Sequence, residues 1–183
     1  ANDTTDSDAD ATGQTGNYSL TALTPNVTDV DAGLFNPIDI SGTVFIDTDM
    51  NGTDDDGTSP STPVTVTLID AITGLPATGF APITTTSTYT FTDVPPGSYY
   101  VTFSTPSGTT ITTSGINSST ITDLTDVDDS DIDNTGQTPI FTVNNGDPNI
   151  DNLDAGFQPQ AATIGDFAFI DLDNDGIYNN NDV

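Results

Sequence analysis

The chain contains no lysine, arginine, histidine or cysteine, and all 28 of its acidic residues are aspartates. Without a basic side chain it can form no salt bridge between side chains, and it cannot attract nucleic-acid phosphates or an anionic membrane surface. Without cysteine, no disulfide can staple the fold. No apolar run approaches the roughly 20 residues that a membrane span needs. We therefore expect no nucleic-acid partner and no direct insertion into a membrane.

A formal charge of −28 makes cations the natural partners of this surface. Scattered aspartates would indicate only a solvated surface, for instance one adapted to salty water. Metal ligation instead requires aspartates in clusters at fixed spacings, because several oxygen atoms must reach one ion. Such clusters are present and are described below.

The hydrophobic fraction of 33% lies mainly in short alternating runs, separated by the 16 glycines and 12 prolines. Alternation with a period of two predicts strands that bury one face, whereas no stretch shows the spacing of an amphipathic helix. The expected strands cover residues 40–46, 64–68, 89–94, 99–103 and 141–143, with a closing segment at 154–157. This pattern predicts an all-β sandwich that folds with the help of counter-ions, although such a charge alone would favour disorder.

The sequence contains an internal repeat whose boundaries do not coincide with the two ends of the chain. Residues 3–36 match residues 126–159 at 14 of 34 positions without a gap, at an offset of 123. The segment beginning at Gly42 returns at Gly165 with one residue inserted. We therefore expect residues 1–37 to be the C-terminal part of a preceding repeat, 38–160 a complete sandwich, and 161–183 the N-terminal part of a following repeat. Because the chain begins with alanine, we also expect processing or a longer precursor.

Two loops place oxygen ligands at alternate positions after a predicted strand, as calcium-binding loops do. The first offers Asp47, Asp49, Asn51, Thr53 through its carbonyl, and Asp55 at the ninth position; the second offers Asp171, Asp173, Asp175, Ile177 through its carbonyl, Asn179, and Asp182. Both differ from an EF-hand, since they follow a strand and lack its glutamate at position twelve. Thr58 holds that position in the first loop, where Asp54 or Asp56 is available instead. The alternative is a turn of Asn, Asp and Gly that holds no metal.

A second acidic cluster occurs in two copies. It comprises Asp126, Asp129, Asp131 and Asp133, which return as Asp3, Asp6, Asp8 and Asp10. Carboxylates this close repel one another unless a divalent cation lies between them, although a solvated acidic loop is the simpler alternative. Ca²⁺ is favoured over Zn²⁺ or Cu²⁺ because histidine and cysteine are absent, and over Mg²⁺ because Mg²⁺ rarely uses a cage made only of protein ligands.

The quoted motifs resemble a known family. Residues 89–103, YTFTDVPPGSYYVTF, look like the signature of prealbumin-like, collagen-adhesin B-type sandwiches, and residues 126–157 are similar to the closing half of the SdrD B-like domain. The resemblance implies an antiparallel Greek-key sandwich that holds several Ca²⁺ ions and serves as an extracellular stalk repeat. It also makes Asp31 and Asp154 weaker candidate ligands. The Lys–Asn isopeptide bond of related domains is chemically impossible here, because the chain has no lysine.

The leading hypothesis is a non-enzymatic structural repeat of a surface stalk or secreted filament, whose partners are neighbouring repeats or identical subunits. The alternative is an adhesin module that itself binds a host or matrix ligand. A glycosidase needs only two carboxylates, but no His, Lys, Cys, Arg or Glu is available to tune or assist them, and metal binding explains the dense aspartate clusters better. Glycans are a further candidate modification, either on asparagine, at the five sequons Asn2, Asn17, Asn26, Asn51 and Asn117, or on threonine and serine.

Overall fold

The computed structural model describes residues 7–10, 13–28, 30–112, 129–160, 170–172, 174 and 176–180. Nine strands and no helix occur in these ranges, and so no helix there is long and apolar enough to cross a membrane. The strands are β1 (Ile38–Ile46), β2 (Val64–Asp70), β3 (Leu75–Pro76), β4 (Ile83–Thr85), β5 (Thr88–Val94), β6 (Gly97–Phe103), β7 (Thr109–Ile111), β8 (Phe141–Val143) and β9 (Ala155–Pro159).

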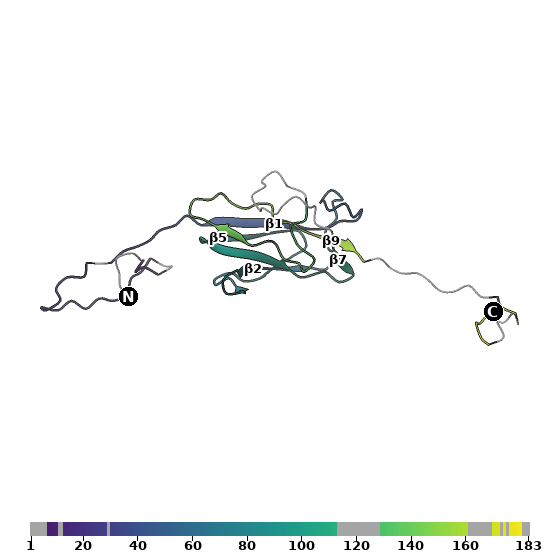
Figure 1. Ribbon diagram of the computed structural model, residues 1–183, viewed down its shortest axis with the longest axis horizontal. Coiled ribbons are helices and arrows are strands. Elements are labelled where there is room, and N and C mark those ends of the chain that lie inside the picture. Colours follow the sequence, from purple (N-terminus) through teal and green to yellow (C-terminus); the bar gives the residue numbers. More distant parts are fainter. Residues whose placement is uncertain are drawn as a thin grey trace.

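The strands form two sheets that face each other (Figure 1). One sheet has the order β5-β1-β9-β7, and the other has the order β3-β2-β6-β8, with β4 also paired to β2. The predicted all-β sandwich is therefore confirmed, and β1, β2, β5, β6 and β8 lie at the five predicted strands, with β9 at the predicted closing segment. The pairings between named strands are antiparallel except for β1 with β9, which run parallel from Val44 beside Ala155 to Ile46 beside Phe157.

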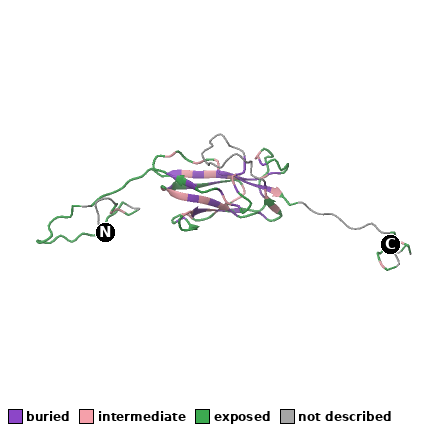
Figure 2. Cartoon of the chain, viewed as in Figure 1, coloured by how far each residue is buried: buried purple, intermediate pink, exposed green. Residues whose placement is uncertain are grey.

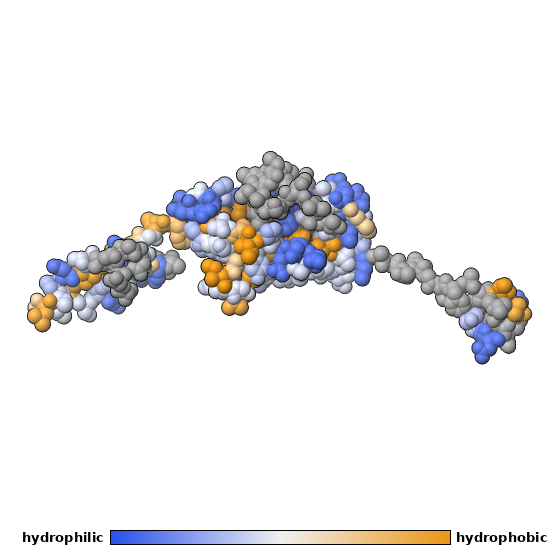
Figure 3. Space-filling model, viewed as in Figure 1, coloured by the Kyte–Doolittle hydropathy of each residue, from blue (hydrophilic) through white to orange (hydrophobic). Residues whose placement is uncertain are grey.

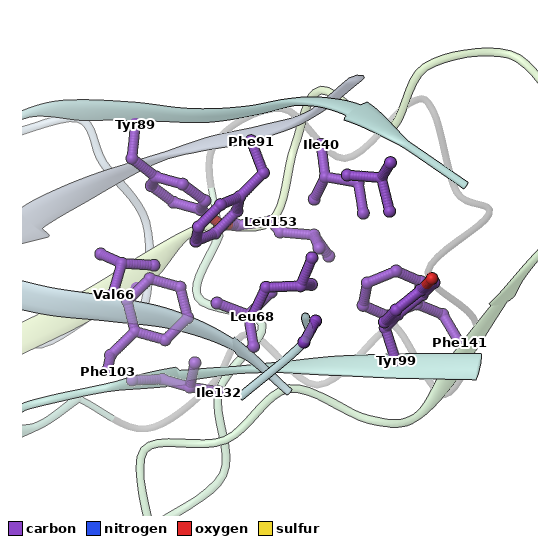
Figure 4. Packing of buried hydrophobic residues seen from close by; sticks show 14 of the residues in the cluster. Ile40, Val66, Leu68, Tyr89, Phe91, Tyr99, Phe103, Ile132, Phe141 and Leu153 are labelled. Carbon is purple, nitrogen blue, oxygen red and sulfur yellow. The ribbon is translucent and has the colours of Figure 1, made fainter. Parts of the chain in front are cut away.

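Buried residues alternate with more exposed ones along the strands (Figure 2), and buried side chains from both sheets fill the space between them (Figure 4). β6, for example, buries Tyr99, Val101 and Phe103. The Tyr89 ring packs edge-on against Phe103, with ring centroids 5.6 Å apart. Its hydroxyl donates a 2.6 Å hydrogen bond to the Leu153 carbonyl. This buried hydroxyl is satisfied by the segment that leads into β9, so the core and the closing segment are tied together.

The parallel pairing of β1 and β9 sets the direction in which the chain passes through the sandwich. β1 is the first strand and β9 the last, so the chain enters at one end of the sandwich and leaves at the other. Figure 1 shows the start of β1 and the end of β9 at opposite ends of the sandwich. This path suits modules that follow one another along a line.

Candidate metal centre

The loop that follows β1, which we call the opening loop (residues 47–56), brings three carboxylates together. Oxygen atoms of Asp47, Asp49 and Asp56 all lie within 4.8 Å of one another. In the ranges that the structure describes, this is the one group of three such side chains. The sequence predicts Asp47 and Asp49 directly and leaves Asp56 as an alternative for the position that an EF-hand gives to glutamate.

Asp47 is fully buried where β1 ends. Its Oδ1 accepts a hydrogen bond of 3.1 Å from the Asn51 amide, and its Oδ2 accepts one of 2.9 Å from the Gly52 amide. The hydroxyl of Thr112, which follows β7, also donates to Oδ2. Burial alone would raise the pKa of Asp47, but these donors outweigh it and lower the pKa. Asp47 therefore carries a negative charge inside the protein.

The other two carboxylates of the cluster lie at the surface. Asp56 Oδ2 accepts hydrogen bonds from the backbone amides of Thr48, at 2.6 Å, and Asp49, at 3.2 Å, so it closes the loop on itself. The pKa of Asp49 is raised, first by partial desolvation and then by the charges of Asp56, Asp55 and Asp47. Asp55, the predicted ninth-position ligand, contacts the side-chain amide of Asn51 at 3.3 Å.

This arrangement is chemically suited to a hard cation. Two unit charges 4 Å apart repel by about 4 kcal/mol at an effective dielectric constant of 20, so three carboxylates held together are costly without an ion between them. No lysine, arginine or histidine exists in the chain to compensate them. Ca²⁺ takes six to eight oxygen ligands from carboxylates, carbonyls and water, and the donors gathered here are all of that class. The residues therefore fit a calcium ion.

The second acidic cluster lies beside this loop, in the segment that we call the closing turn (residues 129–137). The Ser130 amide donates to the Gly52 carbonyl at 3.2 Å, and Asp129 forms an isolated antiparallel bridge with Thr53. Asp129 is buried, so a second carboxylate is held inside the protein near the opening loop. The two predicted acidic regions are thus neighbours in space.

Asp131 and Asp154 are joined by two hydrogen bonds. The Asp131 amide donates to the Asp154 carbonyl at 2.9 Å, and the Asp154 amide donates to Asp131 Oδ2 at 2.7 Å. Asp154 is buried, and its Oδ1 accepts a 2.6 Å hydrogen bond from the Thr43 amide in β1. Asp154, a candidate mainly from the family resemblance, therefore ties the closing segment to the first strand.

The Asp133 carboxylate accepts hydrogen bonds from residues of its own turn. Its Oδ1 accepts hydrogen bonds from the amide and hydroxyl of Thr135, at 2.8 and 2.6 Å, and from the Gln137 amide at 3.1 Å. Burial would raise its pKa, but these bonds and one from Gly136 lower it. The turn thus accounts for the position of Asp133 without requiring an ion.

Glycine is required where β9 approaches its neighbours. A Cβ atom on Gly156 would lie 2.4 Å from Thr112 Cγ2 and 2.6 Å from the Phe45 ring, and one on Gly42 would lie 2.0 Å from the Leu153 carbonyl oxygen. The absence of a side chain therefore lets Thr112 reach Asp47 across the β1–β9 pair. Sequence reasoning missed Thr112, because it lies 65 residues from Asp47 and belongs to no spaced motif.

The flanking segments contain the same local bonds as the sandwich. The Gln14 amide donates a hydrogen bond to Asp10 Oδ1 at 3.0 Å, as the Gln137 amide does to Asp133 Oδ1 at 3.1 Å. Asp171 Oδ2 accepts from the Gly176 amide at 2.8 Å, as Asp47 accepts from Gly52. Asn179 donates to the Ile177 carbonyl at 3.2 Å. Of the predicted ligands, Asp3, Asp6, Asp126, Asp173, Asp175 and Asp182 lie outside the described residues.

Comparison with known proteins supports the resemblance seen in the sequence. The family model of the SdrD B-like domain matches residues 38–157, which is most of the chain. No curated protein matches this chain. This family comprises B-repeat modules of surface proteins, with an adhesin-type structural role and not an enzymatic one. Together with the two-sheet sandwich and its acidic loops, the match shows that the chain belongs to the SdrD B-like domain family.

Proposed function

We propose that this protein is a structural calcium-binding repeat of an extracellular stalk or filament, in which Ca²⁺ stiffens each module. The observation that carries the proposal is the opening loop, where three carboxylates converge, one of them fully buried, in a chain without a basic side chain. The three carboxylates repel one another, and no basic side chain offsets that repulsion. A bound cation removes this cost and converts a repulsive cluster into a link between β1 and the segments beside it.

Calcium binding would couple directly to folding. The ligands come from residues that meet only in the folded sandwich, so the free energy of binding adds to the free energy of folding. Extracellular modules bind calcium with dissociation constants of about 10⁻⁴–10⁻³ M, which suits the millimolar calcium outside cells. Such a module is rigid outside the cell and loosens when calcium is withdrawn.

The arrangement in tandem modules is part of the same proposal. Residues 1–37 would close a preceding module, 38–160 form a complete one, and 161–183 begin a third. The recurrence of hydrogen bonds at Asp10 and Asp133, and at Asp171 and Asp47, supports this division. Because the chain enters the sandwich at the start of β1 and leaves at the opposite end after β9, successive modules would align in a rod.

Isothermal titration calorimetry with three variants tests the calcium proposal. Asp47→Ala and Asp131→Ala should each lower the number of calcium ions bound. Asp70→Ala should not, because the Asp70 carboxylate accepts from the Ile72 and Thr73 amides in its own turn, both at 2.9 Å. Equal losses in all three variants would mean that the charge acts diffusely, and the site assignment would be wrong.

A further inference from the structure

The dipeptide Asn-Gly occurs twice in the chain, at Asn51–Gly52 in the opening loop and at Asn145–Gly146 after β8. In this dipeptide the backbone nitrogen of glycine can attack the side-chain carbonyl carbon of asparagine, because glycine has no side chain to obstruct the approach. The attack requires that the glycine amide is free to lose its proton and that the asparagine side chain is free to turn toward it. The two dipeptides differ in both respects.

The dipeptide in the opening loop is held by hydrogen bonds. The Gly52 amide donates to the buried Asp47 carboxylate at 2.9 Å, and Gly52 is itself buried. Asn51 Oδ1 accepts hydrogen bonds from the amide and the hydroxyl of Thr53, at 2.7 and 2.5 Å. Asn51 Nδ2 donates to two neighbouring carboxylates, at 3.2 and 3.3 Å. Attack by the Gly52 nitrogen on the Asn51 side chain would have to break these bonds, including one to a buried acceptor.

The dipeptide after β8 lies in a tight turn of residues 144–147, which we call the β8 turn. The Asp147 amide donates to the Asn144 carbonyl at 3.2 Å, and Gly146 has a φ of 87°. Asn145 and Gly146 are both exposed, and a Cβ atom added to Gly146 would meet open space. In the part of the chain that the structure describes, no group accepts a hydrogen bond from the Gly146 amide. This amide is therefore free to lose its proton to solvent.

The β8 turn lies beside the start of β1. The Asn36 amide donates to Asn145 Oδ1 at 2.8 Å. The Asp39 amide in β1 donates to Asn149 Oδ1, just after the turn, at 2.9 Å. Figure 3 shows hydrophilic residues at this end of the sandwich. Among the described residues, the exposed bond from Asn36 is the only hydrogen bond to the Asn145 side chain, so this side chain is held far less firmly than its counterpart in the opening loop.

We propose that Asn145 is a site of spontaneous deamidation, with the Gly146 nitrogen as the nucleophile. The Gly146 nitrogen loses its proton to solvent and bonds to Asn145 Cγ, while the Cγ–Nδ2 bond breaks and Nδ2 takes up a proton and leaves as ammonia. The Asn36 amide favours this step, because it donates to the oxygen on which negative charge develops. Water then opens the cyclic succinimide at either carbonyl carbon and yields aspartate or isoaspartate. Isoaspartate routes the main chain through the side-chain carbon and adds a negative charge near Asp147, so the bond from Asn36 is lost.

The test ages the full chain in mildly alkaline buffer and follows both dipeptides in the same sample. Because the chain has no lysine or arginine for trypsin, pepsin fragments are analysed by tandem mass spectrometry, which locates the mass gained when asparagine becomes aspartate. We expect Asn145 to react at least about tenfold faster than Asn51, equivalent to a barrier lower by about 1.4 kcal/mol. In concentrated urea, where neither dipeptide is held, the two rates should converge. Equal rates in the folded protein, or an Asn145 that reacts in urea but not when folded, would overturn the proposal.

Hydrogen–deuterium exchange measures the consequence at the start of β1. The Asn36 amide should exchange faster in the aged protein than in fresh protein, whereas Asn145→Gln should show no such change, because its longer side chain closes a ring far more slowly. Asn149 is an internal control: it also accepts from a backbone amide, that of Asp39, but it precedes Ile150 and should stay unmodified. Ageing that frees Asn36 equally in Asn145→Gln would overturn the proposed consequence. None of these outcomes depends on calcium, so their failure would leave the proposed function standing.

Discussion

The opening loop and the closing turn are built from the same residue type but use it in different ways. In the opening loop, carboxylates of Asp47, Asp49 and Asp56 face one another. In the closing turn, Asp133 faces the amide and hydroxyl donors of its own turn. The loops have similar spacings of aspartate, so spacing alone does not separate a metal-binding role from a turn-forming role. The two roles are distinguished by the groups that each carboxylate faces, other carboxylates in the opening loop and hydrogen-bond donors in the closing turn.

Burial adds a second difference. Asp47 and Asp133 each accept hydrogen bonds from several donors, but Asp47 is fully buried and Asp133 is exposed. Water can replace Asp133 as a partner for its donors, whereas it cannot easily reach the donors around Asp47. A lost acceptor costs more when the donors it leaves behind are buried. The same substitution should therefore have very different consequences in the two regions.

The largest effect should come from Asp47→Ala compared with Asp133→Ala. Asp47→Ala leaves buried donors without an acceptor and should lower the free energy of unfolding by about 3 kcal/mol or more, even in chelator. Asp133→Ala should cost about 1 kcal/mol, as for the loss of a capping side chain. Urea denaturation in excess chelator measures both. Similar losses would show that burial does not distinguish the two regions.

Removal of calcium should have the next largest effect. At 10 mM Ca²⁺ and a dissociation constant of about 10⁻⁴–10⁻³ M, one site adds about 1.4–2.7 kcal/mol, which corresponds to a shift in Tm of about 5–15 °C. Thermal melting with calcium and with chelator, at matched ionic strength, measures the shift. An unchanged Tm would contradict calcium binding in the opening loop.

Asp49→Asn should have a smaller effect, and only on calcium. The pKa of Asp49 is raised by desolvation and by neighbouring carboxylates, so removing its charge relieves repulsion in the absence of the ion. We expect calcium affinity to fall about tenfold, equivalent to 1.4 kcal/mol, while stability in chelator stays equal or rises. Calorimetry and urea denaturation of one preparation give both values. A loss of stability in chelator would mean that Asp49 supports the loop without an ion.

The smallest effect should be the pH dependence contributed by Asp70, which belongs to neither acidic region. Hydrogen bonds from the Thr73 and Ile72 amides lower its pKa below the ordinary value of 3.8. Its stabilising contribution is thus complete above that value and is lost as the pH falls through the lower, folded-state pKa. The difference in urea midpoint between the wild type and Asp70→Asn should shrink from pH 5 to pH 2.5. A difference that grows would reverse the sign of the predicted linkage.

Much of the fold could be predicted because alternation along a strand is a local property. Val64, Val66 and Leu68 alternate with polar residues, and β2 buries all three. The strands that escaped prediction, β3, β4 and β7, have only two or three residues and bury none of them. β8 is equally short, but its Phe141 and Val143 are both apolar and buried on either side of an exposed threonine, so its alternation can be recognised. The parallel pairing of β1 with β9 was also not predicted, because it joins residues more than 100 positions apart.

Composition and short-range spacing are properties of the chain alone, and they suffice to predict a β-sandwich with acidic loops and no basic side chain. Three contacts follow only from the packed sheets: Asp56 joins Asp47 and Asp49, Thr112 reaches Asp47, and Asp154 binds the first strand. These contacts depend on how β1, β7 and β9 lie side by side. A ligand shell is formed by distances in space, and the order of residues along the chain does not contain those distances until the sheets have packed.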